Sequence, residues 1–321
     1  MGVGYKALSL LFKLRLPLAR RLLERRRSFQ FGLSVGCMMK NEAAYLEEWM
    51  TFHIAMGVDH FFLVDDHSTD NSFALLESWV ADGKVTLIRP RKRVFDQWFA
   101  YRQILRRARF KTKWLAFLDV DEFLFSPKYL DLQICLQKFE HSPAVFVYWV
   151  LYGSGGRNAK PNGSVVENFT RCLPLNLVDD DSFAHRAPGG YVTGWARDGK
   201  SIVNPRAVWW PDPHYPKGLL WGQVVDENGD APVIKDELAV CPPTAASLRI
   251  NHYWSKSLEE LRERVYRENI AGKGSPKPQW DRLLERERGL NHAVDPIAQE
   301  ILRKVSFQRI RTETVGLENW D

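Results

Sequence analysis

The chain is poor in cysteine and has no long uninterrupted apolar run. Its 321 residues include four widely spaced cysteines, Cys37, Cys135, Cys172 and Cys241, without CxxC pairing. This argues against a zinc site and a disulfide framework, so we expect Cys37 and Cys135 in the core and a reducing compartment. No GxGxxG follows the first predicted strand and no GxxxxGK[ST] occurs, which disfavours a dinucleotide site and excludes a P-loop.

Positive charge is concentrated at the start of the chain. Residues 1–30 hold eight Lys and Arg against the single acid Glu24, a net +7, whereas the whole chain carries +6, so the remainder carries −1. A nearly neutral body argues against a nucleic-acid-binding protein. Charges interrupt the leucines of this segment, so it cannot span a bilayer, which needs about 20 largely apolar residues.

We therefore expect residues 1–31 to form a basic amphipathic segment that binds an anionic membrane surface. A helix that is solvated or packed on the domain is the alternative. No signal-peptide pattern is evident, so we expect a cytoplasmic protein, peripherally associated with the inner face of the cytoplasmic membrane.

From Gly32 onward, short apolar runs alternate with stretches of helical periodicity. This alternation predicts an α/β fold with right-handed βαβ units and a mainly parallel, Rossmann-like sheet flanked by helices. The second half is less regular and contains a glycine-rich loop at 152–163. We expect a main domain at 32–257 and a helical extension at 258–321. Strands are predicted at 33–38, 60–64, 84–89, 114–118 and 246–251, and helices at 43–56, 71–81 and 96–109.

Acidic clusters follow two of the predicted strands. Clustered carboxylates at the end of a buried strand repel each other and are costly to desolvate, so a cation should neutralise them. Ligands of open α/β sheets bind beyond the carboxyl ends of the strands, and hard oxygen ligands suit Mg²⁺ or Mn²⁺ with a substrate diphosphate. For Asp66 an Asx-turn or helix cap is the alternative. The clusters are Asp65, Asp66 and Asp70, and Asp119, Asp121 and Glu122.

Several short motifs make this pattern more specific. Residues 64–70 are similar to the uridine-binding loop of family 2 glycosyltransferases, and Asp119-Val120-Asp121 is placed like a DxD motif. Together with Lys40-Asn41-Glu42, Glu48-Trp49, Tyr152-Gly153-Ser154-Gly155-Gly156, and Asn251-His252-Tyr253 followed by Lys256-Ser257, they resemble glycosyltransferase family 92 and its bacterial relatives, of the GT-A fold. The resemblance covers roughly residues 33–265.

The resemblance implies a metal-dependent, inverting hexosyltransferase. It would move a sugar from a UDP-sugar, such as UDP-galactose, to a hydroxyl of a glycan or lipid-linked acceptor, in polysaccharide biosynthesis. Asp121 is the expected direct ligand of Mn²⁺ or Mg²⁺, and Asp119 would hold the ribose and the metal through water. His252 is the expected third ligand, since histidine suits Mn²⁺ better than Mg²⁺. A core histidine is the alternative and His214 the rival, while Glu122 supports the ligands or starts a helix.

The same resemblance suggests the nucleotide contacts. Asp66 would accept a hydrogen bond from the uracil N3–H, and Lys200 would contact phosphate. Gln97 and Arg102 are singled out because their positions resemble the family pattern. The remaining nucleotide-binding candidates are Lys40, Asn41 and Glu42.

An inverting transfer also needs a general base that deprotonates the acceptor hydroxyl. Glu167 is the best candidate, because residues 163–169 resemble a family motif downstream of the glycine-rich loop. Asp179, Asp180 and Asp181 are alternatives, unless they form a solvated turn.

Two other functions compete with transfer. A catalytically silent nucleotide-sugar or glycan-binding protein would keep the fold, but the intact Asp119 and Asp121 pair argues against it. A sugar nucleotidyltransferase would have a glycine-rich basic loop after the first strand, where this chain has Lys40-Asn41-Glu42. A metal-dependent phosphatase would need a histidine array that the sequence lacks.

Overall fold

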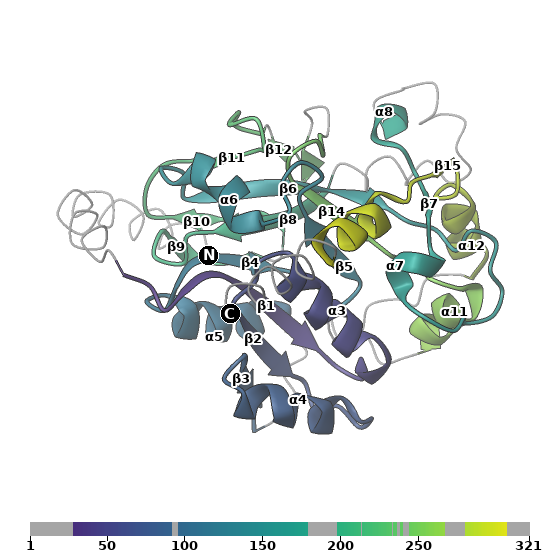
Figure 1. Cartoon of the computed structure of the whole chain (residues 1–321), viewed down its shortest axis with the longest axis horizontal. Coiled ribbons are helices and arrows are strands. Elements are labelled where there is room, and N and C mark those ends of the chain that lie inside the picture. Colours follow the sequence, from purple (N-terminus) through teal and green to yellow (C-terminus); the bar gives the residue numbers. More distant parts are fainter. Residues whose placement is uncertain are drawn as a thin grey trace, which may run out of the picture.

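The structure is a computed structural model that describes residues 28–91, 96–178, 198–212, 214–232, 234–235, 238–239, 244–266 and 280–306. Its centre is a nine-stranded sheet in the order β3-β2-β1-β4-β8-β6-β14-β5, with β11 paired to β6 (Figure 1). The first half contributes β1 (Phe31–Met39), α3 (Ala43–Ala55), β2 (His60–Asp65), α4 (Ser72–Ala81), β3 (Val85–Ile88), α5 (Gln97–Ala108) and β4 (Thr112–Phe117).

The first half of the fold matches the sequence prediction. Strands β1 to β4 are parallel to one another and are linked by α3, α4 and α5. Each strand and helix that the sequence predicts in this half is present, and its observed bounds differ from the predicted ones by at most a few residues. The prediction of an α/β fold with a mainly parallel sheet flanked by helices is confirmed.

The second half departs from simple alternation. Strand β8 lies between β4 and β6 and runs antiparallel to both. Its first residue has to be glycine, since a Cβ on Gly199 would lie 2.1 Å from the Val147 carbonyl oxygen of β6. The remaining elements of this half are β5 (Glu122–Phe125), α6 (Leu132–Leu136), η1 (Gln137–Phe139), β6 (Ala144–Leu151), α7 (Val165–Asn168), β7 (Arg171–Cys172), α8 (Leu175–Val178), β8 (Gly199–Val203), β9 (Val208–Trp210), β10 (Gly218–Leu219), β11 (Val224–Val225), β12 (Ile234–Lys235), β13 (Leu238–Ala239), β14 (Arg249–His252), α11 (Leu258–Tyr266), α12 (Trp280–Arg288) and β15 (Ala293–Val294).

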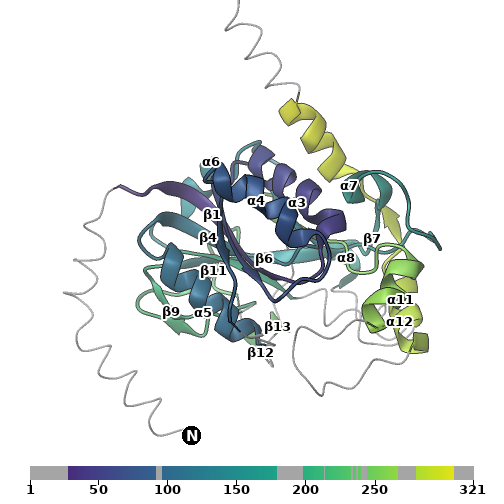
Figure 2. The same ribbon diagram turned by 90° about the horizontal axis from the view of Figure 1, so that it is seen from below.

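Helices cover both faces of the sheet. Figure 2 shows α3, α4 and α6 on one side and α5 on the other. Strand β1 alternates between the two cores accordingly: Cys37 packs with the α3 side, and Met38 with the α5 side. Cys37 and Cys135 are both buried, as predicted. Helices α7, α11 and α12 gather at one end of the molecule in both views (Figures 1 and 2).

Two side chains of α3 hold the backbone of β5. Trp49 Nε1 donates to the carbonyl oxygen of Glu122 at 2.8 Å, and His53 Nε2 accepts from the Leu124 N–H at 3.0 Å. His53 Nδ1 then donates to the Trp49 carbonyl oxygen at 2.7 Å. Burial lowers the pKa of His53 to about 4, so the imidazole is neutral at pH 7, as this bonding pattern requires. These contacts fix the acidic segment between β4 and β5.

Several predictions fall outside the described residues. They concern most of the basic segment 1–31, the three aspartates Asp179, Asp180 and Asp181, and parts of the extension 258–321. Among the residues that the structure describes, no helix is long and apolar enough to cross a membrane.

The buried His53 predicts a loss of stability in mild acid. Because the folded-state pKa lies below the unfolded value of about 6.5, the unfolded chain binds more protons between these values and stability falls as the pH drops. We expect His53 to lower the free energy of unfolding by about 2 kcal/mol between pH 7 and pH 5. Urea unfolding at both pH values measures this. His53→Gln should be less stable at pH 7 but lose less on acidification; an unchanged pH dependence would contradict the assignment.

Candidate functional site

A cavity of about 690 Å³ opens where the sheet strands β1, β4 and β14 end. Its wall combines the segment after β1, the acidic segment after β4, and residues after β14 and on α11. The lining residues are Met38, Met39, Lys40, Asn41, Glu42, Tyr45, Thr69, Gln97, Asp119, Val120, Asp121, His252, Trp254, Ser255, Lys256, Glu260 and Arg264.

Asp121 lies between a histidine and an arginine at this cavity. Its Oδ2 is 3.6 Å from His252 Nε2 and 2.7 Å from Arg264 Nη2. Burial alone would raise the pKa of Asp121, but His252 and Arg264 together hold it well below its usual range. Strand β14 brings His252 here because it pairs antiparallel with β5, which places His252 opposite Glu122. Two predicted metal ligands, Asp121 and His252, are therefore neighbours.

The donor set of Asp121 and His252 suits a divalent ion. A carboxylate oxygen and an imidazole nitrogen are typical ligands of Mn²⁺. His252 Nε2 is the nitrogen directed at Asp121, and Nδ1 is buried without a hydrogen-bond partner among the residues that the structure describes. In the described part of the chain, no group of three or more His, Cys, Asp or Glu side chains has the arrangement of a metal site. A metal here would take its other ligands from water and substrate.

Asp119 faces a different cation from Asp121. Its Oδ2 accepts from the buried ammonium of Lys200 at 2.8 Å, and its Oδ1 accepts from Gln97 Nε2 at 3.3 Å. Lys200 Nζ also lies 3.6 Å from Glu122 Oε1. Burial would lower the pKa of Lys200, but Asp119 and Glu122 hold it well above its usual value. Lys200 is therefore a cation that neutralises the acidic segment.

This position differs from the phosphate contact predicted for Lys200. Its side chain is 1% exposed and is not part of the cavity wall, so its charge is directed at carboxylates. Glu122 is fully buried, begins strand β5 rather than a helix, and accepts from the Asp119 N–H at 2.9 Å. It supports the acidic segment, which is one of the two roles that the sequence left open.

The first acidic loop is mainly structural. Asp65 accepts from the Ser68 N–H at 2.9 Å and pairs with Arg89 at 3.2 Å. Asp70 accepts from the Ser72 N–H at 2.9 Å and from the Ala43 N–H at 3.1 Å, so it joins the starts of α4 and α3. The turn and cap alternative therefore describes these two aspartates better than the metal interpretation of the loop.

The predicted nucleotide residues separate into two groups. Lys40, Asn41, Glu42 and Gln97 line the cavity. The Asn41 side-chain oxygen accepts from the Thr69 N–H at 2.7 Å and so connects the loops after β1 and β2. Two others do not line it: Asp66 is fully buried after β2, and Arg102 is exposed on α5, with its guanidinium 5.3 Å from the Trp210 ring centroid.

Sequence reasoning assigned no role to two cations of the cavity wall. Arg264 comes from α11, and Lys256 follows β14 with a left-handed backbone, φ 50°. Burial lowers the pKa of Lys256, with Asp121 opposing the shift. Its ammonium lies 3.9 Å from the ring centroid of Tyr45. The Lys256-Ser257 motif was the sequence signal for Lys256, whereas Arg264 resembles any charged helix residue.

The predicted base and the rival histidine lie outside this wall. Glu167 is exposed on α7, whose first N–H groups donate to Glu48 of α3. His214 pairs with Asp198, with Nδ1 3.2 Å from the carboxylate. Its ring packs edge-on against Trp149, which also contacts His252. Trp149 thus connects the two histidines, and His214 has its own carboxylate partner.

Removing the buried ammonium tests the neutralisation of the acidic segment. Lys200→Met leaves the carboxylates of Asp119 and Glu122 without their cation. We therefore expect the free energy of unfolding, measured with urea, to fall by about 3–5 kcal/mol. Lys113→Met is the control, because its pair with Glu140 is exposed and should contribute less than about 1 kcal/mol. Adding Asp119→Asn to Lys200→Met should restore part of the loss; strict additivity would exclude direct coupling.

The sequence is similar to one family of glycosyltransferases. The profile of glycosyltransferase family 92 matches residues 30–230. A family 92 protein of Ricinus communis is 32% identical over 113 residues, 34% of this chain and 20% of the relative. The galactan beta-1,4-galactosyltransferase GALS3 of Arabidopsis thaliana is 38% identical over 92 residues, 26% of this chain and 18% of the relative. The chain thus spans about a fifth of the length of the curated relatives it matches.

The similarity to solved structures is weaker. S. aureus TarS in complex with UDP has a TM-score of 0.40 and 12% identity, covering 85% of this chain and 70% of that one. A mannosyltransferase of Pyrobaculum calidifontis in complex with GDP-Man and Mn²⁺ has a TM-score of 0.34 and 14% identity, covering 92% of this chain and 81% of that one. The profile, in contrast, covers more than half of the sequence, and the chain therefore belongs to glycosyltransferase family 92.

Proposed function

We propose that this chain is a metal-dependent, inverting glycosyltransferase. It transfers a sugar from a UDP-sugar to a hydroxyl of a glycan or lipid-linked acceptor. The observation that carries the proposal is the cavity at the strand ends, which gathers the DxD aspartates, His252 and several cations in one wall. Galactose is the sugar we favour, because relatives of this chain are named galactan beta-1,4-galactosyltransferases.

The cations of the cavity suit a diphosphate leaving group. Negative charge builds on the diphosphate as the glycosidic bond breaks, and fixed positive charges near it lower the barrier. Arg264 and Lys256 come from the C-terminal half, and Lys40, which follows β1, also lines the cavity. This set replaces Lys200 as the source of phosphate contacts.

Asp121 and His252 would hold Mn²⁺ or Mg²⁺, which supplies further positive charge to the diphosphate oxygens when bound. Asp119, held by Lys200 and Gln97, is oriented from the sheet side and would accept from the ribose hydroxyls. Asn41 and Glu42, which line the cavity, would contact the uridine. Asp66 and Arg102, which do not line the cavity, remain predicted uridine contacts.

Glu167 remains the proposed general base, with Asp179, Asp180 and Asp181 as alternatives. It is exposed on α7, which is connected through Glu48 to the helix α3 that carries Tyr45 of the cavity wall. We also propose that residues 1–30 bind an anionic membrane surface, where a lipid-linked acceptor would be available.

The first test is UDP release from a panel of UDP-sugars with Mn²⁺ or with EDTA. We expect metal-dependent hydrolysis of one donor, and a drop of at least about 100-fold in Asp121→Ala, because the charge on the leaving group is no longer stabilised. Asp82→Asn, at the exposed end of α4, is the matched control and should keep full activity.

The outcomes separate the competing functions. Metal-dependent UDP binding without turnover, with any acceptor, would favour a silent nucleotide-sugar-binding protein. Pyrophosphate release from a nucleoside triphosphate and a sugar phosphate would identify a nucleotidyltransferase. Absence of binding to every uridine nucleotide would refute the proposal.

Arg264 gives a second test. Arg264→Met removes a charge-assisted contact to the diphosphate, so we expect the Kd for UDP with Mn²⁺ to rise about tenfold, measured by calorimetry. Arg106→Met, on the exposed face of α5, should leave the Kd unchanged. An unaltered Kd in Arg264→Met would remove this residue from the phosphate site.

A further inference from the structure

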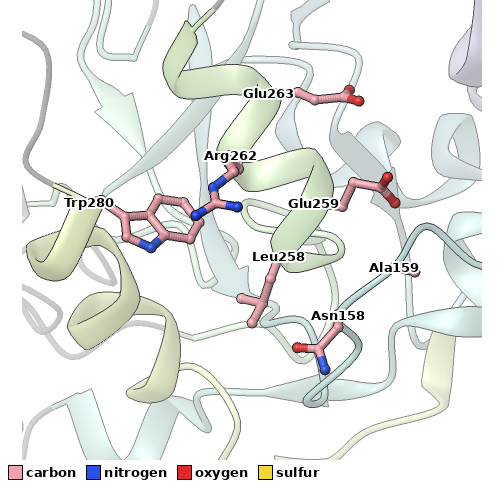
Figure 3. A pocket seen from close by; sticks show the side chains of 7 residues that line it. All are labelled: Asn158, Ala159, Leu258, Glu259, Arg262, Glu263 and Trp280. Carbon is pink, nitrogen blue, oxygen red and sulfur yellow. The ribbon is translucent and has the colours of Figure 1, made fainter.

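A groove separate from the cavity lies on the other side of α11. It measures about 900 Å³, and its walls come from the glycine-rich loop, α11 and the first residue of α12. Figure 3 shows Arg262 beside the Trp280 ring, while Glu259 and Glu263 project from the opposite side of the same helix with their carboxylates apart from each other. The Arg262 guanidinium carbon is 5.2 Å from the centroid of that ring.

The groove is held in shape by hydrogen bonds between its walls. The N–H of Leu258 donates to Arg157 O at 3.0 Å, and that of Glu259 donates to Asn158 O at 2.9 Å. Glu259 Oε2 accepts from the Lys160 N–H at 2.8 Å. The loop is thereby docked along the start of α11, so a ligand meets a surface that needs little ordering on binding.

The loop is also fixed to α12. Ser154 donates through its N–H and its hydroxyl to Glu287 Oε1, at 2.8 and 2.6 Å. A Cβ on Gly153 would lie 2.4 Å from Asn291 Oδ1, so glycine at this position allows the Asn291 side chain to lie against the loop. Both helices that supply the groove are thus joined to one loop.

Helix α11 contributes to both concavities. Glu260 and Arg264, four residues apart, face the cavity that holds Asp121, whereas Glu259 and Glu263 line the groove. A helix with its side chains is about 10 Å across. A chain-like ligand in the groove would therefore lie about one helix diameter from the candidate donor site.

The chemistry of the groove differs from that of the cavity. Among the described residues that line it, the groove offers an aromatic ring, the apolar Leu258, an amide on Asn158, two carboxylates and one guanidinium. An excess of carboxylates disfavours phosphates and other anionic chains. A ring with polar groups around it suits a ligand that has apolar faces and hydroxyl edges.

We propose that this groove binds a neutral oligosaccharide chain, the acceptor whose end is extended in the neighbouring cavity. The inference rests on the proposed function for the identity of the reaction, but glycan binding in the groove is measurable without turnover. Trp280 supplies the stacking surface, and Glu263 accepts from sugar hydroxyls.

The experiment uses the full chain on an array of neutral and anionic oligosaccharides, followed by Kd measurement with β-1,4-galacto-oligosaccharides of increasing length. We expect binding of neutral chains that strengthens with length. Trp280→Ala should weaken it about tenfold and Glu263→Gln several-fold, whereas Trp280→Phe keeps most of it. The Kd for UDP with Mn²⁺ should stay unchanged in all three variants.

Phe110→Ala, at an exposed aromatic outside both concavities, is the matched control and should bind glycans like the parent chain. The proposal is overturned if the chain binds no neutral oligosaccharide. It is also overturned if anionic glycans bind better, or if Trp280→Ala and Glu263→Gln bind as the parent does. Loss of UDP turnover with intact glycan binding would instead refute the proposed function and leave the groove assignment in place.

Discussion

The buried ammonium of Lys200 is the interaction on which the candidate site depends. The carboxylates that follow strand β4 would repel one another at close range, and Lys200 lies between Asp119 and Glu122. This cation arrives on β8, the antiparallel strand inserted between β4 and β6, and β8 can approach β6 so closely because its first residue is Gly199. The irregular sheet order and the acidic site are therefore consequences of the same packing arrangement.

Asp119 and Asp121 are neutralised from opposite sides. Asp119 is paired from the sheet, and Asp121 is paired by His252 and Arg264 of the C-terminal half. The family profile ends at residue 230, so these two partners lie beyond the segment it matches. The site is thus assembled from residues that lie far apart in the sequence.

The sequence predicted the first half of the fold well, because strand and helix periodicities are local and regular there. It also predicted that Asp121 and His252 belong to one site, and their side chains lie 3.6 Å apart in the structure. It did not predict β8 or the position of Lys200, since a lysine in a short apolar run carries no signal for a buried carboxylate partner. The turn and capping roles of Asp65 and Asp70 were not separable from a metal-binding role for a related reason: capping and metal-binding aspartates are identical in sequence.

Helix α11 has a consequence for how specificity can change. Its residues at 260 and 264 belong to one concavity and those at 259 and 263 to the other, separated only by the rotation of the helix. Substitutions on one face leave the side chains of the other face in place. Evolution or engineering can therefore alter one recognition surface without rebuilding its neighbour, within a single element of nine residues.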